Sequence, residues 1–353
     1  MLPPTNRREL FALKKGSKMA ELLEVKNLSV SFDTPDGEAE AVRDVSFFVK
    51  KGETLAIVGE SGCGKSVLCR SIMKLLPKTA RIKSGSVLLD GKEITGLTEK
   101  EMQKLRGNSF SMVFQDPMTT LNPAMTVGAQ IAEAVIIHRP EFSREEVRCR
   151  VWELMELVGI DHPKERAAQY PWNFSGGMRQ RSVLAIALAS EPAVLLADEP
   201  TTALDVTIQA QIFELMEKLK REHDTAIMLI THDMGVVSEL ADDVAVMYMG
   251  SIVERGSVRE VLKYPAHPYT AALLRSIPIL HKGRGQRLEP IRGSTPDPYD
   301  RPKGCQFAPR CDFCCEKCRQ EMPPEVPVCD GHAVRCWNAE QVYAGHREEV
   351  EAV

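Results

Sequence analysis

The strongest chemical signal in the 353-residue sequence is a phosphate-binding loop. Residues 59–66 read Gly-Glu-Ser-Gly-Cys-Gly-Lys-Ser and match G-x-x-x-x-G-K-[ST], between an apolar run and a stretch with helical spacing. In such a loop the backbone amides wrap phosphates, Lys65 reaches the β and γ phosphates, and the Ser66 hydroxyl holds Mg²⁺. The flanking pattern disfavours a plain glycine turn. The expected nucleotide contacts are Gly59, Ser61, Gly62, Cys63, Gly64, Lys65, Ser66 and Val67.

Two further apolar runs end in polar residues suited to phosphate chemistry. Residues 193–197 lead into Asp198 and Glu199, and residues 226–230 are followed by His232. A buried carboxylate without a compensating charge destabilises the folded protein. A bound Mg²⁺ ion would supply that charge for Asp198. Glu199 is then expected to orient and deprotonate the attacking water, and His232 to sense the γ phosphate. Alone, the carboxylate pair would more often be a solvated strand end; the phosphate loop reverses that preference.

A second anion-binding helix start is expected at Ser175, Gly176 and Gly177. A serine cap followed by two glycines presents free backbone amides at the positive end of a helix. Two phosphate sites for one nucleotide look redundant within one chain. They are explained if the second site serves a nucleotide bound by a partner chain.

The elements that must position these motifs follow an α/β pattern. Residues 22–49 alternate around a polar turn at 33–37, which predicts antiparallel strands. Residues 116–172 lack buried-strand runs and are expected to be mostly helical. Short solid apolar runs are typical of parallel strands covered on both faces. These runs are 54–58, 111–114, 193–197 and 226–230.

Composition narrows the possible partners and compartments. The net charge of −4 gives no overall positive potential to attract the phosphates of a nucleic acid, so nucleic acid is not expected as a partner. The longest apolar runs fall far short of the roughly 20 residues that a spanning helix needs. Residues 1–18 show no secretory signal, and we expect a cytosolic chain. Met19 resembles a natural start, and we expect residues 1–18 to be an extension without structure.

The proline content rises after Leu262, where the α/β rhythm stops. We therefore expect two units with a boundary near residues 263–268. The expected division is an extension at 1–19, an ATPase domain at 20–265 with a helical subdomain at about 116–175, and a C-terminal extension at 266–353.

Seven of the ten cysteines crowd between Cys305 and Cys336, which indicates metal or redox chemistry rather than a disulfide framework. The pairs Cys311-x-x-Cys314 and Cys315-x-x-Cys318 have the spacing of zinc ligands. The two pairs are directly adjacent, however, and the backbone would be strained if all four cysteines bound one tetrahedral zinc ion. An iron-sulfur cluster, zinc and no metal all stay open at this point.

The ordered motifs resemble those of the ATP-binding subunits of ABC transporters, across residues 21 to about 256. Besides the motifs above, Gln115 in Phe-Gln-Asp-Pro and Asp205 in Ala-Leu-Asp match the family pattern. The resemblance implies that Phe32 stacks on adenine, that Gln115 links Mg²⁺ to the docking groove for a membrane subunit, and that Asp205 lines a dimer interface. It implies a head-to-tail dimer with ATP between the two chains. Met178 stands where the family usually has glutamine.

Two segments are similar to the dipeptide, oligopeptide and nickel importer group. One is residues 115–123, and the other begins at His267-Pro268-Tyr269. The cysteine-rich end also resembles this group, in which it is associated with a four-iron four-sulfur cluster. That resemblance selects Cys305, Cys311, Cys318 and Cys336 as cluster ligands and leaves Cys314, Cys315 and Cys329 as extras.

The resemblance therefore predicts an ATPase that energises peptide import. We expect it to be a peripheral subunit, bound at the cytoplasmic face of the cell membrane. Expected partners are a second ATPase chain, related or identical, two transmembrane permeases, and a substrate-binding protein acting through them. Expected cofactors are ATP, Mg²⁺ and the cluster. Nickel or another solute is an alternative cargo. A soluble ABC ATPase is the alternative class, although no long coiled coil or second ATPase domain is visible.

Overall fold

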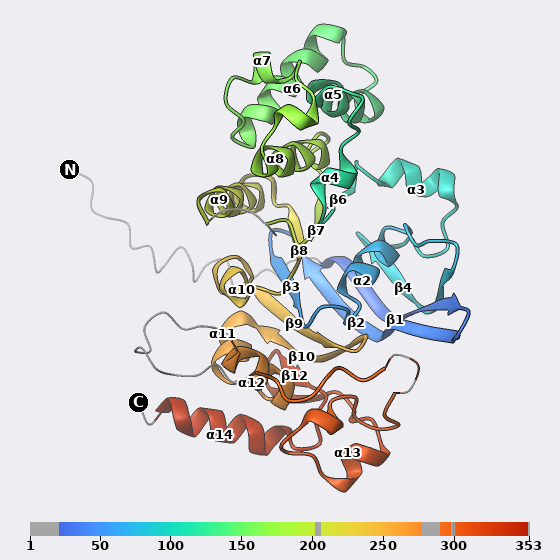
Figure 1. Cartoon of the computed structure of the whole chain (residues 1–353), viewed down its shortest axis with the longest axis vertical. Helices are drawn as coiled ribbons and strands as arrows, with labels where there is room; N and C mark the ends of the chain where they lie inside the picture. Colours follow the sequence, from blue (N-terminus) through green and yellow to red (C-terminus); the bar gives the residue numbers. More distant parts are fainter. Residues whose placement is uncertain (1–20, 202–205, 277–289, 298, 300, 352–353) are drawn as a thin grey trace, which may run out of the picture.

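The computed structural model describes residues 21–201, 206–276, 290–297, 299 and 301–351. The expected extension at 1–19 and the predicted interface residue Asp205 lie outside the described residues. Figure 1 shows an elongated molecule with a helical group at one end, sheets in the middle and the C-terminal segment at the other end.

The N-terminal part forms an antiparallel sheet with strand order β2-β1-β4-β5. The polar turn predicted near Pro35 joins the first two strands, and Thr34 pairs with Gly37. Alternate residues of these strands are buried, as expected for a sheet with one covered face. The strands are β1 (Glu21–Thr34), β2 (Gly37–Lys50), β4 (Ala80–Leu89) and β5 (Lys92–Glu93).

The second sheet has eight strands in the order β11-β12-β10-β9-β3-β8-β7-β6. Its centre is parallel, from β9 through β3, β8 and β7 to β6. The parallel strands are β3 (Thr54–Val58), β6 (Phe110–Val113), β7 (Val194–Asp198), β8 (Ala226–Thr231) and β9 (Asp243–Tyr248). Antiparallel β10 (Ser251–Ser257), β12 (His332–Val334) and β11 (Val326–Cys329) extend one edge.

Both faces of the parallel strands are covered, which explains their solid apolar runs. On β3, Leu55 and Ile57 pack into the core shared with the antiparallel sheet. Ala56 and Val58 pack into a core that also holds Tyr269 and Phe307. Burial on both faces requires apolar residues at every position, so the strand shows no alternation.

The helices fall into two groups. Those around the sheets are α2 (Lys65–Ile72), α3 (Glu99–Leu105), α9 (Val206–His223), α10 (Met234–Leu240) and α11 (Val258–Lys263). Those of the helical end are α4 (Pro117–Thr120), α5 (Val127–His138), α6 (Arg144–Leu157), α7 (Pro163–Arg166), η2 (Pro171–Asn173) and α8 (Gly176–Ala187). Helices α5, α6 and α8 pack on one another and lie at the end of the molecule opposite the C-terminal segment (Figure 1).

The C-terminal segment contains short elements joined by long connections. They are α12 (Pro268–Arg275), η3 (Ala308–Arg310), α13 (Glu316–Gln320), the β11–β12 hairpin and α14 (Ala339–Glu351). Strand β12 pairs with β10, and Glu254 is the partner of Val334. The segment is therefore joined to the remainder of the eight-stranded sheet by backbone hydrogen bonds.

The structure confirms the predicted fold class: an α/β core with an antiparallel portion and a C-terminal extension. Strand β3 has the predicted bounds, whereas β6 and β7 are each displaced by one residue from the predicted runs. Helix α8 begins at Gly176, directly after Ser175, which caps it as the sequence predicts.

Candidate active site

The phosphate loop connects the end of β3 to the start of α2. Gly59 has φ +152°, and a Cβ there would lie 2.1 Å from the carbonyl oxygen of Met247. Gly64 has φ +104°, and its Cβ would lie 2.3 Å from the carbonyl oxygen of Ala41. Only glycine fits either position. Residues with a Cβ rarely adopt such backbone angles, and the nearby carbonyl oxygens belong to the backbone and cannot move aside as a side chain could.

Lys65 is held across its own loop. Its Nζ donates hydrogen bonds to the carbonyl oxygens of Gly59 at 2.8 Å and Glu60 at 3.0 Å. The residue is buried, and the Cys63 sulfur also lies 3.7 Å from its Nζ. The loop therefore presents a full positive charge together with the amides at the start of α2, which suits an anionic ligand.

Ser66 and Asp198 meet across the gap between α2 and β7. The Ser66 hydroxyl donates to Oδ1 of Asp198 at 2.9 Å. Burial raises the pKa of Asp198 above its ordinary value, and the Ser66 hydrogen bond opposes that rise. A hydroxyl oxygen and a carboxylate oxygen are ligands that Mg²⁺ prefers. The structure thus brings together two of the residues assigned to Mg²⁺ by sequence.

Glu199 is the meeting point of three strand ends. Its Oε2 accepts from Nε2 of Gln115 at 2.9 Å, and its Oε1 lies 3.2 Å from Nδ1 of His232. Gln115 follows β6, Glu199 follows β7 and His232 follows β8. Glu199 has φ +49°, an uncommon angle for a residue with a side chain. The carboxylate is therefore held by two neighbouring side chains at the edge where parallel sheets bind ligands.

The second predicted anion site stands apart from the phosphate loop. Ser175 caps α8 by accepting a hydrogen bond from the Met178 amide at 3.3 Å. Ser175 and Gly176 are exposed, and Gly177 packs toward Ile208. Within the described residues, no hydrogen bond or ion pair joins residues 175–177 to residues 59–66. The cap geometry is as expected, and the amides of this helix start face solvent.

Phe32 lies on β1 opposite Ala39 of β2, and its side chain is half-buried. Two residues further along β2, Ala41 approaches Gly64 of the phosphate loop. The pairing of β1 with β2 therefore places Phe32 close along the sheet to the part of β2 that adjoins the loop.

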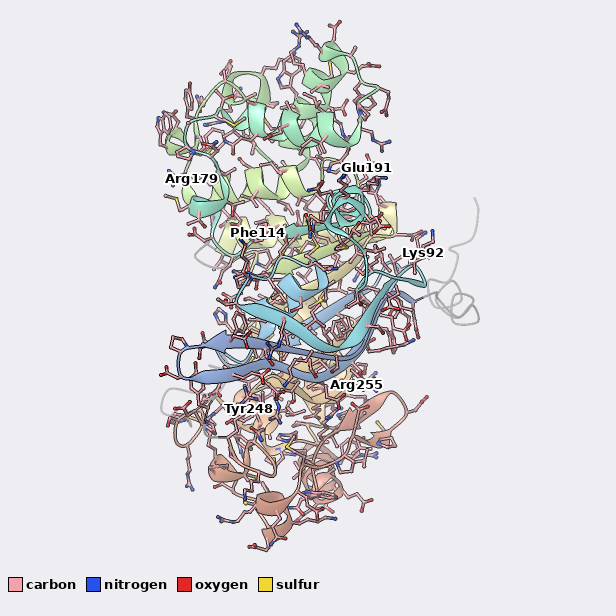
Figure 2. All side chains as sticks on the ribbon, turned by 90° about the vertical axis from the view of Figure 1, so that its right-hand side faces the viewer. Lys92, Phe114, Arg179, Glu191, Tyr248 and Arg255 are labelled. Atoms are coloured by element: carbon pink, nitrogen blue, oxygen red, sulfur yellow. The ribbon has the colours of Figure 1, made fainter. Side chains whose placement is uncertain are left out.

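One contact of the phosphate loop had not been expected from the sequence. Arg310 of the C-terminal segment donates to both carboxylate oxygens of Glu60, at 2.7 and 3.0 Å. The Glu60 amide donates to the Tyr269 hydroxyl at 2.8 Å. Arg310 also lies 3.3 Å from the hydroxyl of Tyr248, which Figure 2 places near the junction of sheet and extension. Arg310 and Tyr269 both lie in segments that resemble the importer group. No sequence pattern indicated these contacts, because Glu60 is 250 residues from Arg310 and 209 residues from Tyr269.

A cavity in the C-terminal segment brings four cysteines together. It is lined by Cys305, Cys311, Cys318 and Cys336, with His267, Phe307 and Trp337 among the other lining residues. Burial is the main cause that raises the pKa of Cys311 and of Cys336 to about 12 each. These are the four cysteines selected by resemblance, and the other three of the segment do not line the cavity. The sulfur of Cys315 lies 3.4 Å from that of Cys318.

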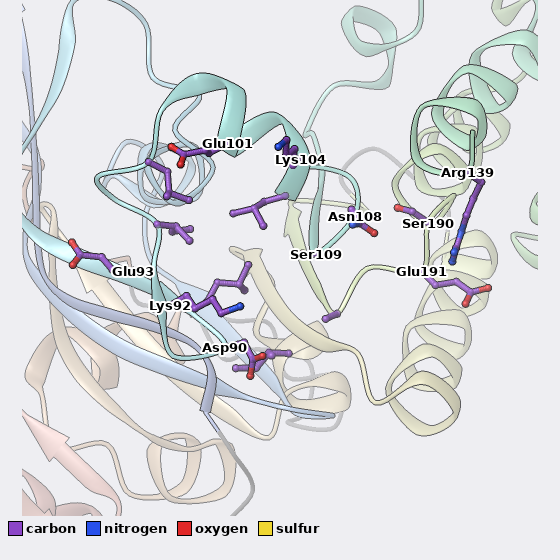
Figure 3. Close-up of a pocket in the computed structure, with 16 residues that line it drawn as sticks. Asp90, Lys92, Glu93, Glu101, Lys104, Asn108, Ser109, Arg139, Ser190 and Glu191 are labelled. Atoms are coloured by element: carbon purple, nitrogen blue, oxygen red, sulfur yellow. The ribbon is translucent and has the colours of Figure 1, made fainter. Parts of the chain in front are cut away.

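A separate cavity of about 650 Å³ lies between the antiparallel sheet, α3 and the helical end (Figure 3). Leu89, Lys92, Lys104, Arg139 and Glu191 are among its lining residues. None of the predicted nucleotide or metal residues lines it. Among the described helices, none combines the length and apolar character needed to cross a bilayer.

Comparison with known proteins agrees with this geometry. Residues 42–202 match the family described as ABC transporter, and residues 253–318 match that described as oligopeptide/dipeptide transporter, C-terminal region. Among solved structures, the dimeric ATP-binding cassette MJ0796 bound to ADP and Pi has a TM-score of 0.62 and 28% identity. That comparison covers 67% of this chain and 99% of MJ0796.

Two relatives come from Bacillus subtilis (strain 168). The oligopeptide transport ATP-binding protein OppD is 52% identical over 321 residues, covering 91% of this chain and 89% of OppD. The dipeptide transport ATP-binding protein DppD is 51% identical over 324 residues, covering 92% and 96%. With the phosphate loop, the strand-end residues and the C-terminal match in place, the chain belongs to the ABC-type transport ATPases that form the ATP-binding subunits of oligopeptide and dipeptide importers and energise peptide import.

Proposed function

We propose that the chain hydrolyses ATP at the edge of its eight-stranded sheet with Glu199 as the general base. The observation that carries this assignment is the convergence of Gln115 and His232 on the Glu199 carboxylate, next to the Ser66–Asp198 pair. Glu199 accepts a proton from the attacking water, while His232 and Gln115 keep the carboxylate from rotating away. His232 is well exposed, so its ring remains accessible to the γ phosphate.

The remaining residues bind and orient the nucleotide. Lys65 donates charge-assisted hydrogen bonds to the β and γ phosphates, and the amides of the loop wrap them. Phe32 stacks on the adenine ring. Ser66, Asp198 and Gln115 would hold Mg²⁺, which when bound neutralises charge on the phosphate oxygens. The hard oxygen donors seen at Ser66 and Asp198 fit that ion.

The chain works as one half of a dimer in which Ser175, Gly176 and Gly177 complete the partner's nucleotide site and Asp205 lines the interface. The exposed amide end of α8, which serves no site within the described chain, supports this arrangement. MJ0796 was solved as a dimer. The partner is an identical or a related chain.

The dimer docks on two transmembrane permeases at the cytoplasmic face of the cell membrane and energises the import of peptides delivered by a substrate-binding protein. Peptide as cargo is supported by the OppD and DppD relatives. Residues 20–265 form the ATPase domain, with the helical subdomain at about 116–175, and residues 266–353 form the extension.

The transport role is tested by isolating the complex from membranes and reconstituting it in proteoliposomes. We expect two permeases and a binding protein to copurify, and labelled di- or oligopeptide to accumulate with ATP but not with a non-hydrolysable analogue. Copurification of a soluble assembly without permeases would contradict the proposal. Accumulation of nickel but not peptide would instead assign a different cargo.

The four-cysteine cavity would hold a four-iron four-sulfur cluster. Its donors are thiols, which suit iron-sulfur clusters, and amides of Phe307 and Asn338 point to the sulfurs of Cys305 and Cys336. A tetrahedral zinc site would need sulfurs about 3.8 Å apart, given Zn–S bonds of about 2.3 Å. Within the described residues, no three of these four sulfurs lie within 4.8 Å of one another. That spread fits ligands that bind different iron atoms better than ligands of one zinc ion.

Anaerobic purification tests the cluster. The protein is expected to be brown and to contain iron and acid-labile sulfide, and each of Cys305→Ser, Cys311→Ser, Cys318→Ser and Cys336→Ser should remove the colour. Cys314→Ser and Cys315→Ser are matched controls that should keep it. Because the cavity lies outside the nucleotide site, the colourless variants should still bind ATP. A colourless wild-type protein with one zinc per chain, released by Cys314→Ser or Cys315→Ser, would refute this assignment.

A further inference from the structure

A second cluster of potential metal ligands lies where the C-terminal hairpin meets α11. A ring nitrogen of His332, the sulfur of Cys329 and a carboxylate oxygen of Glu260 lie within 4.8 Å of one another. The Cys329 sulfur is 4.0 Å from Oε2 of Glu260. No residue of this group lines the four-cysteine cavity.

The hairpin brings two of these side chains to the same face. Cys329 ends β11, His332 begins β12, and the two residues are direct partners across the two-residue turn formed by Asp330 and Gly331. Directly opposed residues of an antiparallel pair project from the same face of the sheet. The turn also packs closely on the core, since a Cβ on Gly256 would lie 3.2 Å from both the Gly331 carbonyl and the His332 Cα. The Cys-x-x-His spacing is therefore held in a fixed geometry.

The imidazole of His332 is oriented by a buried carboxylate. Its Nε2 lies 2.7 Å from Oε1 of Glu254, and both side chains are fully buried. Glu254 is itself held by the amides of Ala266 at 2.6 Å and His267 at 3.0 Å. A carboxylate that accepts from one ring nitrogen makes the other nitrogen a better ligand, and this arrangement recurs in histidine metal sites.

The other ring nitrogen of His332, Nδ1, is buried and makes no hydrogen bond within the described residues. A buried polar atom without a hydrogen-bond partner destabilises the folded protein, so it calls for an explanation. With Nε2 donating to Glu254, Nδ1 carries a lone pair that can accept from the Cys329 thiol or bind a cation.

We propose that His332, Cys329 and Glu260 form a binding site for one divalent cation of the zinc class. A neutral imidazole, a thiolate and a carboxylate are zinc ligands and together balance a dication. Three protein ligands leave a fourth position for water. The ion would tie α11 of the ATPase core to the hairpin of the extension. This site is independent of the proposed iron-sulfur cluster.

Metal analysis of the full-length protein, purified anaerobically and equilibrated with ZnSO₄ before desalting, tests the site. We expect about one zinc per chain, and X-ray absorption at the zinc edge should show one sulfur with nitrogen or oxygen as the other ligands. Because that edge is element-specific, iron in the same protein does not interfere. Cys329→Ser and Glu260→Gln should each reduce bound zinc at least about tenfold, whereas Cys315→Ser should not.

Folding of the variants is checked by ATP binding, which should be unchanged. Added zinc should raise the melting temperature of the wild type but not of Cys329→Ser, because a ligand stabilises the folded protein only where the folded protein has a site that binds it. Three results would overturn the proposal: no retained zinc, zinc content insensitive to Cys329→Ser and Glu260→Gln, or a shell of four sulfurs that is lost in Cys336→Ser. The last result would also reject the iron-sulfur assignment, whereas the first two would leave it intact.

Discussion

The nucleotide site and the cysteine-rich extension are built in contrasting ways. At the proposed nucleotide site, Gln115, Glu199 and His232 follow the ends of the neighbouring parallel strands β6, β7 and β8, which bring them to a common edge. In the extension, the four cavity cysteines are spread over 305–336, among short helices and a hairpin. Regular structure thus carries the first site, whereas irregular packing assembles the second.

The two regions are nevertheless in contact. Arg310, next to Cys311, binds Glu60 of the phosphate loop, and Tyr269 accepts from the backbone of the same residue. Figure 2 shows Arg255 near this boundary as well, where it pairs with Glu325. The comparison therefore raises the question of how far the nucleotide site depends on the extension, and the following substitutions address it.

The largest effect is expected for Glu199→Gln. The amide keeps the shape of the side chain but cannot accept a proton, so ATP turnover should fall by about 10²- to 10⁴-fold while ATP binding is kept. Steady-state phosphate release and equilibrium nucleotide binding measure the two properties. Glu191→Gln is a matched control, because Glu191 also has a positive φ, +55°, and lies in the separate cavity. Turnover above a tenth of the wild-type rate would remove Glu199 from its assigned role.

Arg310→Met should destabilise the protein by about 2–3 kcal/mol in urea unfolding. Removing one partner of a buried ion pair leaves an uncompensated charge, although Glu60 keeps some contact with solvent. Arg255→Met is the matched control: both side chains of its ion pair are about one third exposed, and the loss should be below about 1 kcal/mol. Equal losses in the two variants would show that the Arg310 contact does not brace the phosphate loop.

Lys65→Ala should weaken ATP binding by about 10- to 100-fold, because it removes charge-assisted hydrogen bonds to the phosphates. Titration of a fluorescent ATP analogue measures the change. Lys104→Ala, in the separate cavity, serves as the control and should bind normally. Wild-type affinity in Lys65→Ala would contradict the phosphate-loop assignment.

The smallest effect is expected for Tyr269→Phe, which removes the hydroxyl that accepts from the Glu60 amide. Loss of this hydrogen bond should cost about 1 kcal/mol of stability. The phenyl ring keeps its packing against Tyr248 and Phe307. A loss as large as that in Arg310→Met would show that the tyrosine, rather than the ion pair, is the main link between the two regions.

The sequence by itself identified the family and the motifs of the proposed nucleotide site. The phosphate loop, the serine cap at Ser175 and the polar residues after strands are encoded within a few residues, and parallel strands place their carboxyl ends at one edge. The solid apolar runs identified those strands, because both faces are buried. The bounds of β6 and β7 differed by only one residue.

Only the tertiary structure decided which groups of the extension meet. Residues 305–336 have no long periodic element, so cysteine spacing alone left an iron-sulfur cluster, zinc and no metal as alternatives, and only the family resemblance selected four of the cysteines. The Arg310–Glu60 pair and the group of Cys329, His332 and Glu260 join segments 250 and 69 residues apart. Such contacts depend on how coil and hairpin pack on the sheet, and the packing of side chains from distant segments leaves no local pattern in the chain.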